Sequence, residues 1–266
     1  MKIGRVIGPA TDGEPSVGVI EGQNVYLYDR SGGGAGFGSV KNVCLDDVKA
    51  FLPPEPPNVF AIGLNYRDHA AEGNMDVPKR PVVFLKATTA VIGHQQPIML
   101  PSIAPDEVDF EAELAVVIGE TAKNVPSEDA LDYVMGYTCA NDVSARDCQL
   151  KLDQQWARAK SFDTFAPIGP WIETEVDPSD LMIRSILNGD VMQESSTSQM
   201  IFPVEELVSF LSRCFTLQPG TVILTGTPAG VGAARDPEVF LRPGDTIEIE
   251  IEGVGTLTNP VRAAAD

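Results

Sequence analysis

The sequence predicts a β-rich α+β fold. Strand-like runs are frequent, helical patterns are few and short, and the two do not alternate regularly as they do in parallel α/β sheets. The length of 266 residues and the hydrophobic content of 43% suit one large domain, alone or with a small second one.

Residues 1–55 are predicted to form a small N-terminal β domain. Short β-type runs at 2–7, 17–20 and 24–27 precede a glycine-rich stretch at 31–39. These glycines fit neither a dinucleotide-binding pattern nor a P-loop, so a flexible connection is expected. The proline-rich run at 53–57 predicts a stiff linker, after which residues 56–266 form the main domain.

The main domain is predicted to consist mostly of strands. The Asn188-Gly189 pair predicts a hairpin turn. Helices are expected at 127–133, after a serine cap at Ser127, and at 203–214, where apolar residues recur at helical spacing after a proline. The expected strands are 58–63, 82–86, 108–119, 134–140, 182–194, 222–225 and 246–252.

The formal net charge of -19 disfavours partners that are themselves anionic, so neither nucleic acid nor membrane is expected as a partner. An anionic substrate would need local cations or a metal ion. No apolar run approaches membrane-spanning length, and the four cysteines have no CxxC spacing. A cytoplasmic protein with reduced thiols is expected.

Two carboxylates lie on one predicted strand. From 108 to 118 every even position is apolar, so these residues should form one buried face. Glu111 and Glu113 share the opposite face, which continues with Ala115 and Val117 and is therefore not simply a wet surface. Carboxylates aimed at one half-enclosed space repel each other unless a cation lies between them.

Asp142 follows another apolar run and is a third candidate. Three carboxylates from neighbouring strands make an oxygen-only site suited to Mg²⁺ or Mn²⁺. With only two histidines in the chain, a three-histidine zinc site is excluded. Taken alone, the Glu-x-Glu pair equally fits a solvated strand face, and Asn141-Asp142 equally fits a turn.

His69 and Glu72 lie three residues apart in a stretch, YRDHAAEG, that predicts one or two helical turns. At this spacing Glu72 accepts a hydrogen bond from His69 and orients its ring, and such a histidine draws protons near neutral pH. A surface pair that merely supports a short helix is the alternative.

Several long motifs, in order and with compatible spacing over residues 58 to about 260, resemble the fumarylacetoacetate hydrolase superfamily. They are AIGLNYRDHAAE (61–72), VVFLKATTAVIG (82–93), VDFEAELAVVIG (108–119), GYTCANDVSARDCQ (136–149), QWARAKSFDTFAPIGPWI (155–172), LTGTPAGVG (224–232) and RPGDTIEIEIEGVGTL (242–257). The resemblance implies the mixed β-sandwich or β-roll of that family, with a small N-terminal domain, and a homodimer.

The resemblance also implies roles for single residues. Glu111, Glu113 and Asp142 become ligands of Mg²⁺ or Mn²⁺. The His69–Glu72 pair becomes catalytic on a lid, followed by a polar segment that suits a hinge. The remaining implied residues are Lys160 as a further catalytic group, and Lys86, Arg67, Arg146, Gln149 and Thr227 as substrate-binding groups.

Three of these assignments have structural alternatives. A lysine that ends a buried strand, such as Lys86, often reaches solvent instead of a site. Arg146 and Asp147 equally fit the polar surface of a helix beginning near Ser144. The segment His94-Gln95-Gln96 departs from the small residues, Pro or Gly usual in relatives, and is either a bias on substrate choice or a surface change.

The expected reaction is hydrolysis or decarboxylation of a small 2-oxo or 2,4-dioxo acid, such as an acylpyruvate or oxaloacetate, through a metal-stabilised enolate. An isomerase or dehydratase, acting on a 2-hydroxydienoate or a 2-keto-3-deoxy sugar acid, is the alternative on the same scaffold. A non-catalytic, metal-stabilised binding protein is the third possibility. The serine-hydrolase motif G-x-S-x-G is absent.

Overall fold

The computed structural model describes residues 1–8, 11, 14–28, 40–52 and 54–264. The glycine-rich stretch 31–39 and Pro53 of the predicted linker lie outside the described residues. The α-helices are short: α1 (Arg67–Glu72), α2 (Ala157–Lys160) and α3 (Val204–Cys214). The strands are β1 (Lys2–Ile7), β2 (Ser16–Glu21), β3 (Asn24–Tyr28), β4 (Val40–Cys44), β5 (Ala50–Leu52), β6 (Val59–Ile62), β7 (Val83–Lys86), β8 (Val91–Ile92), β9 (Ile98–Leu100), β10 (Val108–Asp109), β11 (Ala112–Ile118), β12 (Val134–Asn141), β13 (Ser144–Ala145), β14 (Ala166–Glu173), β15 (Met182–Leu187), β16 (Asp190–Ser196), β17 (Val222–Leu224), β18 (Thr246–Ile251) and β19 (Gly255–Ala263).

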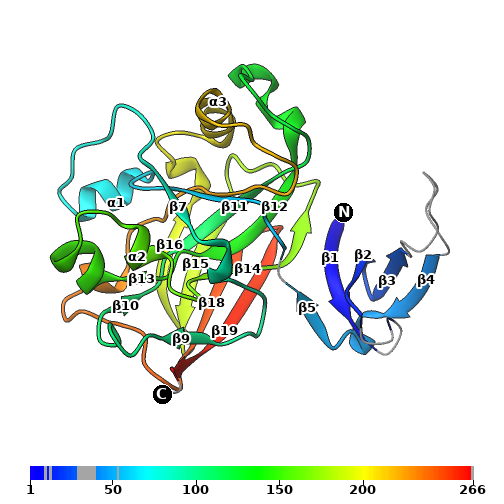
Figure 1. Ribbon diagram of the computed structural model, residues 1–266, viewed down its shortest axis with the longest axis horizontal. Coiled ribbons are helices and arrows are strands. Elements are labelled where there is room, and N and C mark those ends of the chain that lie inside the picture. The colour runs from blue at the N-terminus through cyan, green and yellow to red at the C-terminus, as the bar shows by residue number, and fades with distance from the viewer. Residues whose placement is uncertain (9–10, 12–13, 29–39, 53, 265–266) are drawn as a thin grey trace.

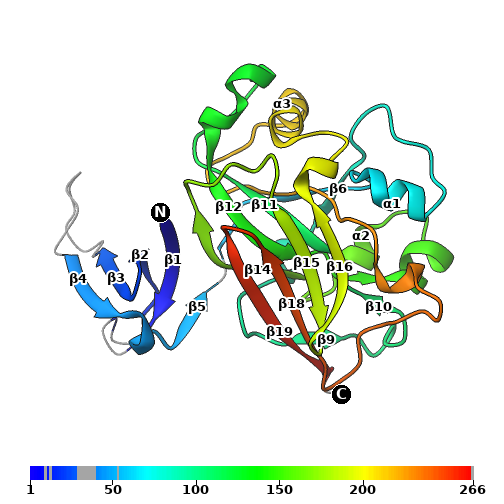
Figure 2. The same cartoon turned by 180° about the vertical axis from the view of Figure 1, so that it is seen from behind.

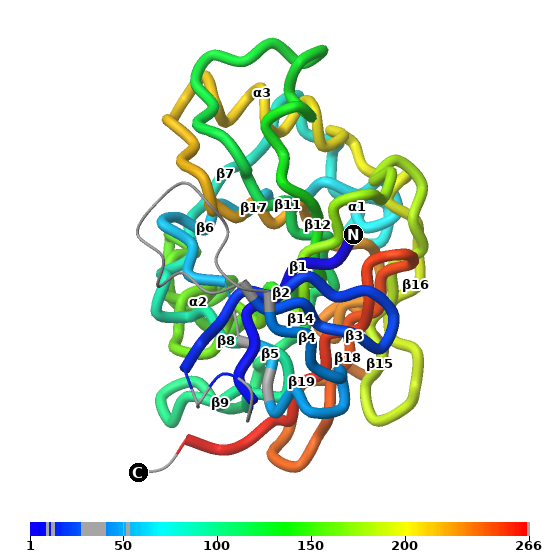
Figure 3. The backbone as a smooth tube through the Cα atoms, turned by 90° about the vertical axis from the view of Figure 1, so that its right-hand side faces the viewer, coloured from blue at the N-terminus to red at the C-terminus, as the bar shows by residue number. Residues whose placement is uncertain are grey.

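One long mixed sheet runs through the chain in the order β4-β3-β2-β1-β14-β12-β11-β17-β6-β7. The N-terminal strands join it through antiparallel pairing of Lys2 with Glu173 and of Ile3 with Ile172. They lie to one side of the remaining chain (Figure 1), and the view from that side places β1 and β2 across β14 (Figure 3). Their own small core contains Val6, Ile20, Val25 and Leu27.

A second sheet, β16-β15-β18-β19-β9, packs against the centre of the first (Figure 2). The main core lies between them. It contains the even-numbered residues of 108–118 and apolar residues of the second sheet, such as Ile183 and Ile249. Ala115 and Val117 belong to a separate cluster on the opposite face, which confirms the predicted alternation. The predicted β-rich fold is thus confirmed.

The strand expected at 108–119 is interrupted. β10 pairs with β13, whereas β11 pairs with β12 and β17, and Phe110-Glu111 lie between the two segments. At the break, a side chain replaces a ladder partner: the Glu111 amide donates to Asn141 Oδ1 at 3.0 Å. The break turns Glu111 out of the regular strand.

Two helix expectations need correction. The segment Ser127–Tyr133 is a 3₁₀ helix, and Pro126, not Ser127, occupies its N-cap position without a side-chain hydrogen bond. The segment at Ser144 begins as strand β13, and a π-helical turn follows at Cys148–Leu152. The predicted turn at Asn188-Gly189 is confirmed, since both residues have the positive φ that a type I′ hairpin requires. Among the described residues, no helix has both the length and the apolar character needed to cross a bilayer.

Candidate active site

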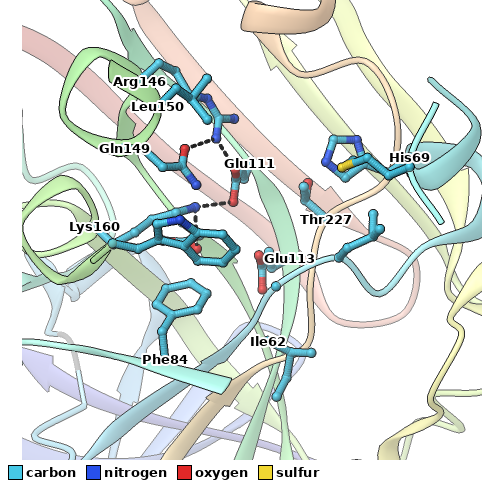
Figure 4. A pocket seen from close by; sticks show the side chains of 15 residues that line it. Ile62, His69, Phe84, Glu111, Glu113, Arg146, Gln149, Leu150, Lys160 and Thr227 are labelled. Carbon is cyan, nitrogen blue, oxygen red and sulfur yellow. Dashed lines mark hydrogen bonds and ion pairs between the residues drawn. The ribbon is translucent and has the colours of Figure 1, made fainter. Parts of the chain in front are cut away.

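Three carboxylates meet where β11 begins and β12 ends. Antiparallel pairing sets Glu113 opposite Ala140 and Ala112 opposite Asn141, so Glu111 and Asp142 lie just beyond the paired ends. All three acids are buried, and one oxygen of each lies within 4.8 Å of the others. Figure 4 shows Glu111 and Glu113 side by side within the pocket. The structure therefore brings together the three predicted metal ligands.

Buried cations hold two of these carboxylates. Lys160 Nζ donates to Glu111 Oε2 at 2.7 Å and to Asp142 Oδ2 at 2.9 Å. Lys86 Nζ donates to the other oxygen of Asp142, and Arg146 Nη1 lies 2.8 Å from Glu111 Oε1. Burial lowers the pKa of Lys86, but its ion pair with Asp142 favours the charged form.

The pKa values of Glu111 and Glu113 are shifted in opposite directions. Burial opposes ionisation of Glu111, yet Lys160 and Arg146 hold its pKa well below the usual range. Burial, together with the charges of Asp142 and Glu111, raises the pKa of Glu113 well above its usual value. Glu113 receives one hydrogen bond, from the Gly226 amide at 2.7 Å.

The donor set fits a hard divalent cation. It is made of buried carboxylate oxygens and contains no sulfur or imidazole, as Mg²⁺ and Mn²⁺ prefer. A cation would also relieve the repulsion that raises the pKa of Glu113. Glu111, Glu113 and Asp142 would hold it.

Glu111, Glu113 and Asp142 together form a carboxylate cage. The His69–Glu72 pair lies on α1 beside this cage. His69 lines the pocket, and its Nδ1 lies 3.2 Å from Glu72 Oε2. The Gly230 amide donates to Glu72 Oε1 at 2.9 Å, which fixes the carboxylate that orients the ring. Figure 4 shows the His69 ring across the pocket from Glu111. The pair is thus placed to move a proton at a molecule bound over the carboxylates.

Contacts at the start of α1 attach it to the segment before α3. Arg67 Nη1 donates to the Met200 carbonyl at 2.7 Å, and Ser195 Oγ donates to Asp68. Arg67 is not among the residues that line the pocket, so its substrate-binding role stays a prediction. Lys86 likewise lies behind Asp142 and outside the lining.

Arg146 is buried and contacts three other side chains, so it does not lie on an exposed helix surface. Its Nε donates to Asp109 Oδ2 at 2.8 Å and its Nη1 to Gln149 Oε1 at 2.7 Å, in addition to its pairing with Glu111. The Gln149 carbonyl is therefore occupied, and no described residue accepts a hydrogen bond from the side-chain amide of Gln149. Both side chains line the pocket.

Thr227 also lines the pocket, but its hydroxyl is already engaged. It donates to the Ala112 carbonyl at 2.9 Å and accepts from Gln193 Nε2 at 2.7 Å. Gln193 in turn accepts from the Ala112 amide. This arrangement makes Thr227 a support for the start of β11.

Sequence reasoning missed two parts of the site. Asp109 receives backbone N–H bonds from Gly232 and Ala233 besides the Arg146 pair. The sequence did contain a signal for Asp109, because it alternates with the apolar residues in the same way as Glu111 and Glu113 do. An apolar wall was also missed, since apolar side chains are ordinarily assigned to the core. The wall of this cavity of about 200 Å³ consists of Ile62, Leu64, Met75, Phe84, Leu150 and Trp156.

The segment at His94 does not contribute to the pocket. His94 Nδ1 accepts a hydrogen bond from the Thr258 amide at 3.1 Å, and the Gln95 amide donates to the Thr258 carbonyl. These contacts attach the loop before β9 to β19, and His94 is absent from the pocket lining.

Comparison with known proteins identifies the family. A family model described as fumarylacetoacetate (FAA) hydrolase C-terminal matches residues 58–262. The chain belongs to the fumarylacetoacetate hydrolase family. The family predicted from the sequence motifs is therefore confirmed. The chain is an enzyme of this family, whose members act on small acids.

Members of the family that are similar to this chain differ in their named reactions. The mitochondrial oxaloacetate tautomerase of Xenopus laevis is 49% identical over 210 residues, which are 77% of this chain and 66% of that protein. The structure of a 2-hydroxyhepta-2,4-diene-1,7-dioate isomerase from Mycobacterium marinum is 43% identical, covers 100% of both chains and has a TM-score of 0.85. The structure of a fumarylacetoacetate hydrolase from psychrophilic Exiguobacterium antarcticum is 37% identical, covers 99% of this chain and 100% of its own, and has a TM-score of 0.87.

Proposed function

We propose that this enzyme moves a proton at the carbon next to the 2-oxo group of a small 2-oxo acid, with the help of Mg²⁺ or Mn²⁺. The result is interconversion of keto and enol forms or of double-bond isomers. The observation that carries the proposal is the oriented His69–Glu72 pair, which faces a buried three-carboxylate cage across one pocket.

A divalent cation held by Glu111, Glu113 and Asp142 would supply Lewis-acid polarisation of the 2-oxo group. Around it, the side chains of this protein position the substrate and the proton. The free amide hydrogens of Gln149 are available to a substrate carboxylate. His69 takes the proton from the carbon and delivers it to the 2-oxo oxygen, which gives the enol, or to a carbon further along the chain, which gives the double-bond isomer, while Glu72 orients the ring.

Lys160 lines the same pocket as His69 and contacts two of the three carboxylates. Its ammonium group is fixed between Glu111 and Asp142, so it balances two of the cage carboxylates and lowers the cost of negative charge that develops on the substrate. This role needs no movement of the side chain.

Carbon–carbon cleavage, by hydrolysis or decarboxylation, is the second candidate. The same His69 is placed to draw a proton from water, and the hydrolase from Exiguobacterium antarcticum supports this reaction class. We rank it second because the tautomerase and the isomerase are more similar to this chain in sequence than that hydrolase is.

The test measures oxaloacetate enol decay and pyruvate release separately, with Mg²⁺, Mn²⁺ or EDTA. Metal-dependent loss of the enol without pyruvate is expected, and Glu111→Ala should abolish both Mn²⁺ binding in calorimetry and turnover. Glu120→Ala, at an exposed acid that follows β11, is the matched control. Pyruvate release from oxaloacetate or acetylpyruvate would favour cleavage, and activity indifferent to EDTA and to Glu111→Ala would reject the proposal.

A further inference from the structure

A second cavity, of about 260 Å³, lies beside α3. It is bordered by the end of the segment that follows α1, by the first residue of the 3₁₀ helix at 127–133 and by one face of α3. It shares no lining residue with the cavity at the carboxylate cage. A molecule bound there would therefore not occupy the place of a substrate.

Three basic side chains and one acid line this second cavity. The bases are Lys79, Arg80 and Arg213, and the acid is Glu206. With all four ionised, three positive charges against one negative charge leave two net positive charges. The whole chain has the opposite balance, with 38 acidic and 19 basic residues. A local positive excess in so negative a molecule concentrates anions at that place.

The three bases have N–H groups available to a ligand. In the part of the chain that the structure describes, the side chains of Lys79 and Arg80 have no ion-pair or hydrogen-bond partner, and no ion pair joins Glu206 to a base of the cavity. Arg213 makes one hydrogen bond, from Nη2 to Ser209 Oγ at 3.2 Å. By contrast, the lysine and the arginine of the cage cavity are paired with buried carboxylates.

A phosphate monoester with an aromatic ring fits these groups. Its charge of about −1.5 to −2 near neutral pH balances the two net positive charges. Guanidinium groups present pairs of N–H donors that match phosphate oxygens. Phe202 and Phe210 also line the cavity and are only partly buried, so they offer ring surface on which a flat ring can stack. A nucleoside monophosphate combines both features.

The cavity also adjoins both ends of the segment that contains α1. Before α1, the Phe202 amide donates to Asn65 Oδ1 at 2.9 Å, and Asn65 Nδ2 donates to the Phe202 carbonyl at 3.1 Å. After α1, residues 73–77 are exposed, and residues 79–81 line the cavity. Met75, within the exposed stretch, lines the cavity at the cage. A ligand that joins residues 79–81 to α3 would therefore hold the end of this segment in place.

We propose that this cavity is a second ligand site, which binds a nucleoside monophosphate through Lys79, Arg80 and Arg213 and thereby restrains residues 73–82. The inference goes beyond the proposed function, because it concerns a site that shares no residue with the cage and holds for any reaction at the cage. The ligand acts by binding alone, without a covalent step.

The chain offers a matched pair of arginines for the test. Arg80 and Arg262 are both exposed, and neither has an ion-pair partner among the residues that the structure describes. Arg262 lies on β19 and lines neither cavity. Glutamine at either position removes the same charge, so the comparison separates contact with the ligand from long-range attraction. Lys79→Gln is a second variant within the cavity.

Calorimetry on the metal-free full chain measures binding of adenosine monophosphate, adenosine and inorganic phosphate. Metal-free protein is used because phosphate would otherwise coordinate a cation at the cage. Wild type should bind adenosine monophosphate at least about tenfold more tightly than either fragment. Arg80→Gln and Lys79→Gln should each weaken this binding by about tenfold, and Arg262→Gln should change it by less than about twofold.

Hydrogen exchange followed by mass spectrometry then locates the bound ligand. At a concentration of adenosine monophosphate that saturates wild type, exchange should slow at residues 73–82 and in α3, and the effect should be smaller in Arg80→Gln.

Four results would overturn the inference: no binding of adenosine monophosphate, equal affinity for inorganic phosphate, equal weakening in Arg80→Gln and Arg262→Gln, or slowed exchange only outside these two segments. Because these measurements need neither metal nor turnover, a failure of the proposed proton transfer would leave them unchanged.

Discussion

At the scale of single residues, the site depends on ion pairs that do more than balance charge. Arg146 pairs with Glu111 on one side and with Asp109 on the other. Asp109 also accepts hydrogen bonds from the backbone amides of Gly232 and Ala233. One guanidinium thus connects a predicted metal ligand to a loop more than a hundred residues away. Its removal would leave buried Asp109 without a cation partner and Glu111 with Lys160 alone.

Arg146→Met should therefore destabilise the protein by about 3–5 kcal/mol, the usual cost of breaking a buried pair from one side. Urea unfolding of metal-free protein measures the change. Arg158→Met is the control, because the Arg158–Asp153 pair lies at the surface and its loss should be within error. If Arg146→Met leaves the free energy of unfolding almost unchanged, this account is wrong, and Asp109 and Glu111 are then protonated or hydrated at little cost.

At the scale of elements, short connecting segments fix the edges of the second sheet. The loop before β9 depends on an unprotonated His94 Nδ1, which accepts from the Thr258 amide of β19. Asn259 Nδ2 strengthens the same junction by donating to the Gly93 and Gln96 carbonyls, each at 2.8 Å. Burial lowers the pKa of His94, although Glu248 opposes this shift.

His94 should make the free energy of unfolding depend on pH, because burial lowers its pKa in the folded state. A base with a lowered pKa in the folded state binds more protons when unfolded, so its contribution is present above the unfolded pKa of about 6.5 and is lost as pH falls below it. His94→Asn, which keeps an acceptor without titrating, should flatten the fall in unfolding free energy between pH 6.5 and lower values. Parallel profiles for wild type and His94→Asn would contradict this account.

At the scale of the whole molecule, the N-terminal strands extend the central sheet but contribute nothing to the cage. β1 covers the edge of β14, and Phe51 packs edge to face on Trp171 with ring centroids 5.5 Å apart. All three candidate ligands and the His69–Glu72 pair lie in the predicted main domain. The division into residues 1–55 and 56–266 and the homodimer both stay predictions.

Removal of residues 1–55 should lower thermal stability yet leave Mn²⁺ affinity within about twofold of the full chain, because distant sites contribute independently. The exposed β14 edge should also promote association. Calorimetry and light scattering measure the two effects. A truncated chain that no longer binds Mn²⁺ would show that the first 55 residues are needed to form the main domain.

The sequence alone determined the fold class and the alternating faces of the segment at 108–118, and its family motifs indicated the candidate acids and histidine of the site. These features are local: strand periodicity needs no knowledge of neighbours, and the family motifs are contiguous. The helical turn at YRDHAAEG and the Asn188-Gly189 hairpin followed from side-chain chemistry within a few residues. For the same reason, sequence periodicity located most strands within two residues of their observed ends.

Tertiary structure decided what depends on residues far apart in the chain. β14 and β19 contain prolines that argue against strands in sequence, and long-range pairing with β12 and β18 overrides that preference. Lys160 lies between Glu111 and Asp142 because α2 packs against β7 and β13, which no local pattern encodes. The apolar wall was equally hidden, since the same side chains fit a core or a pocket until the fold leaves one side of them open.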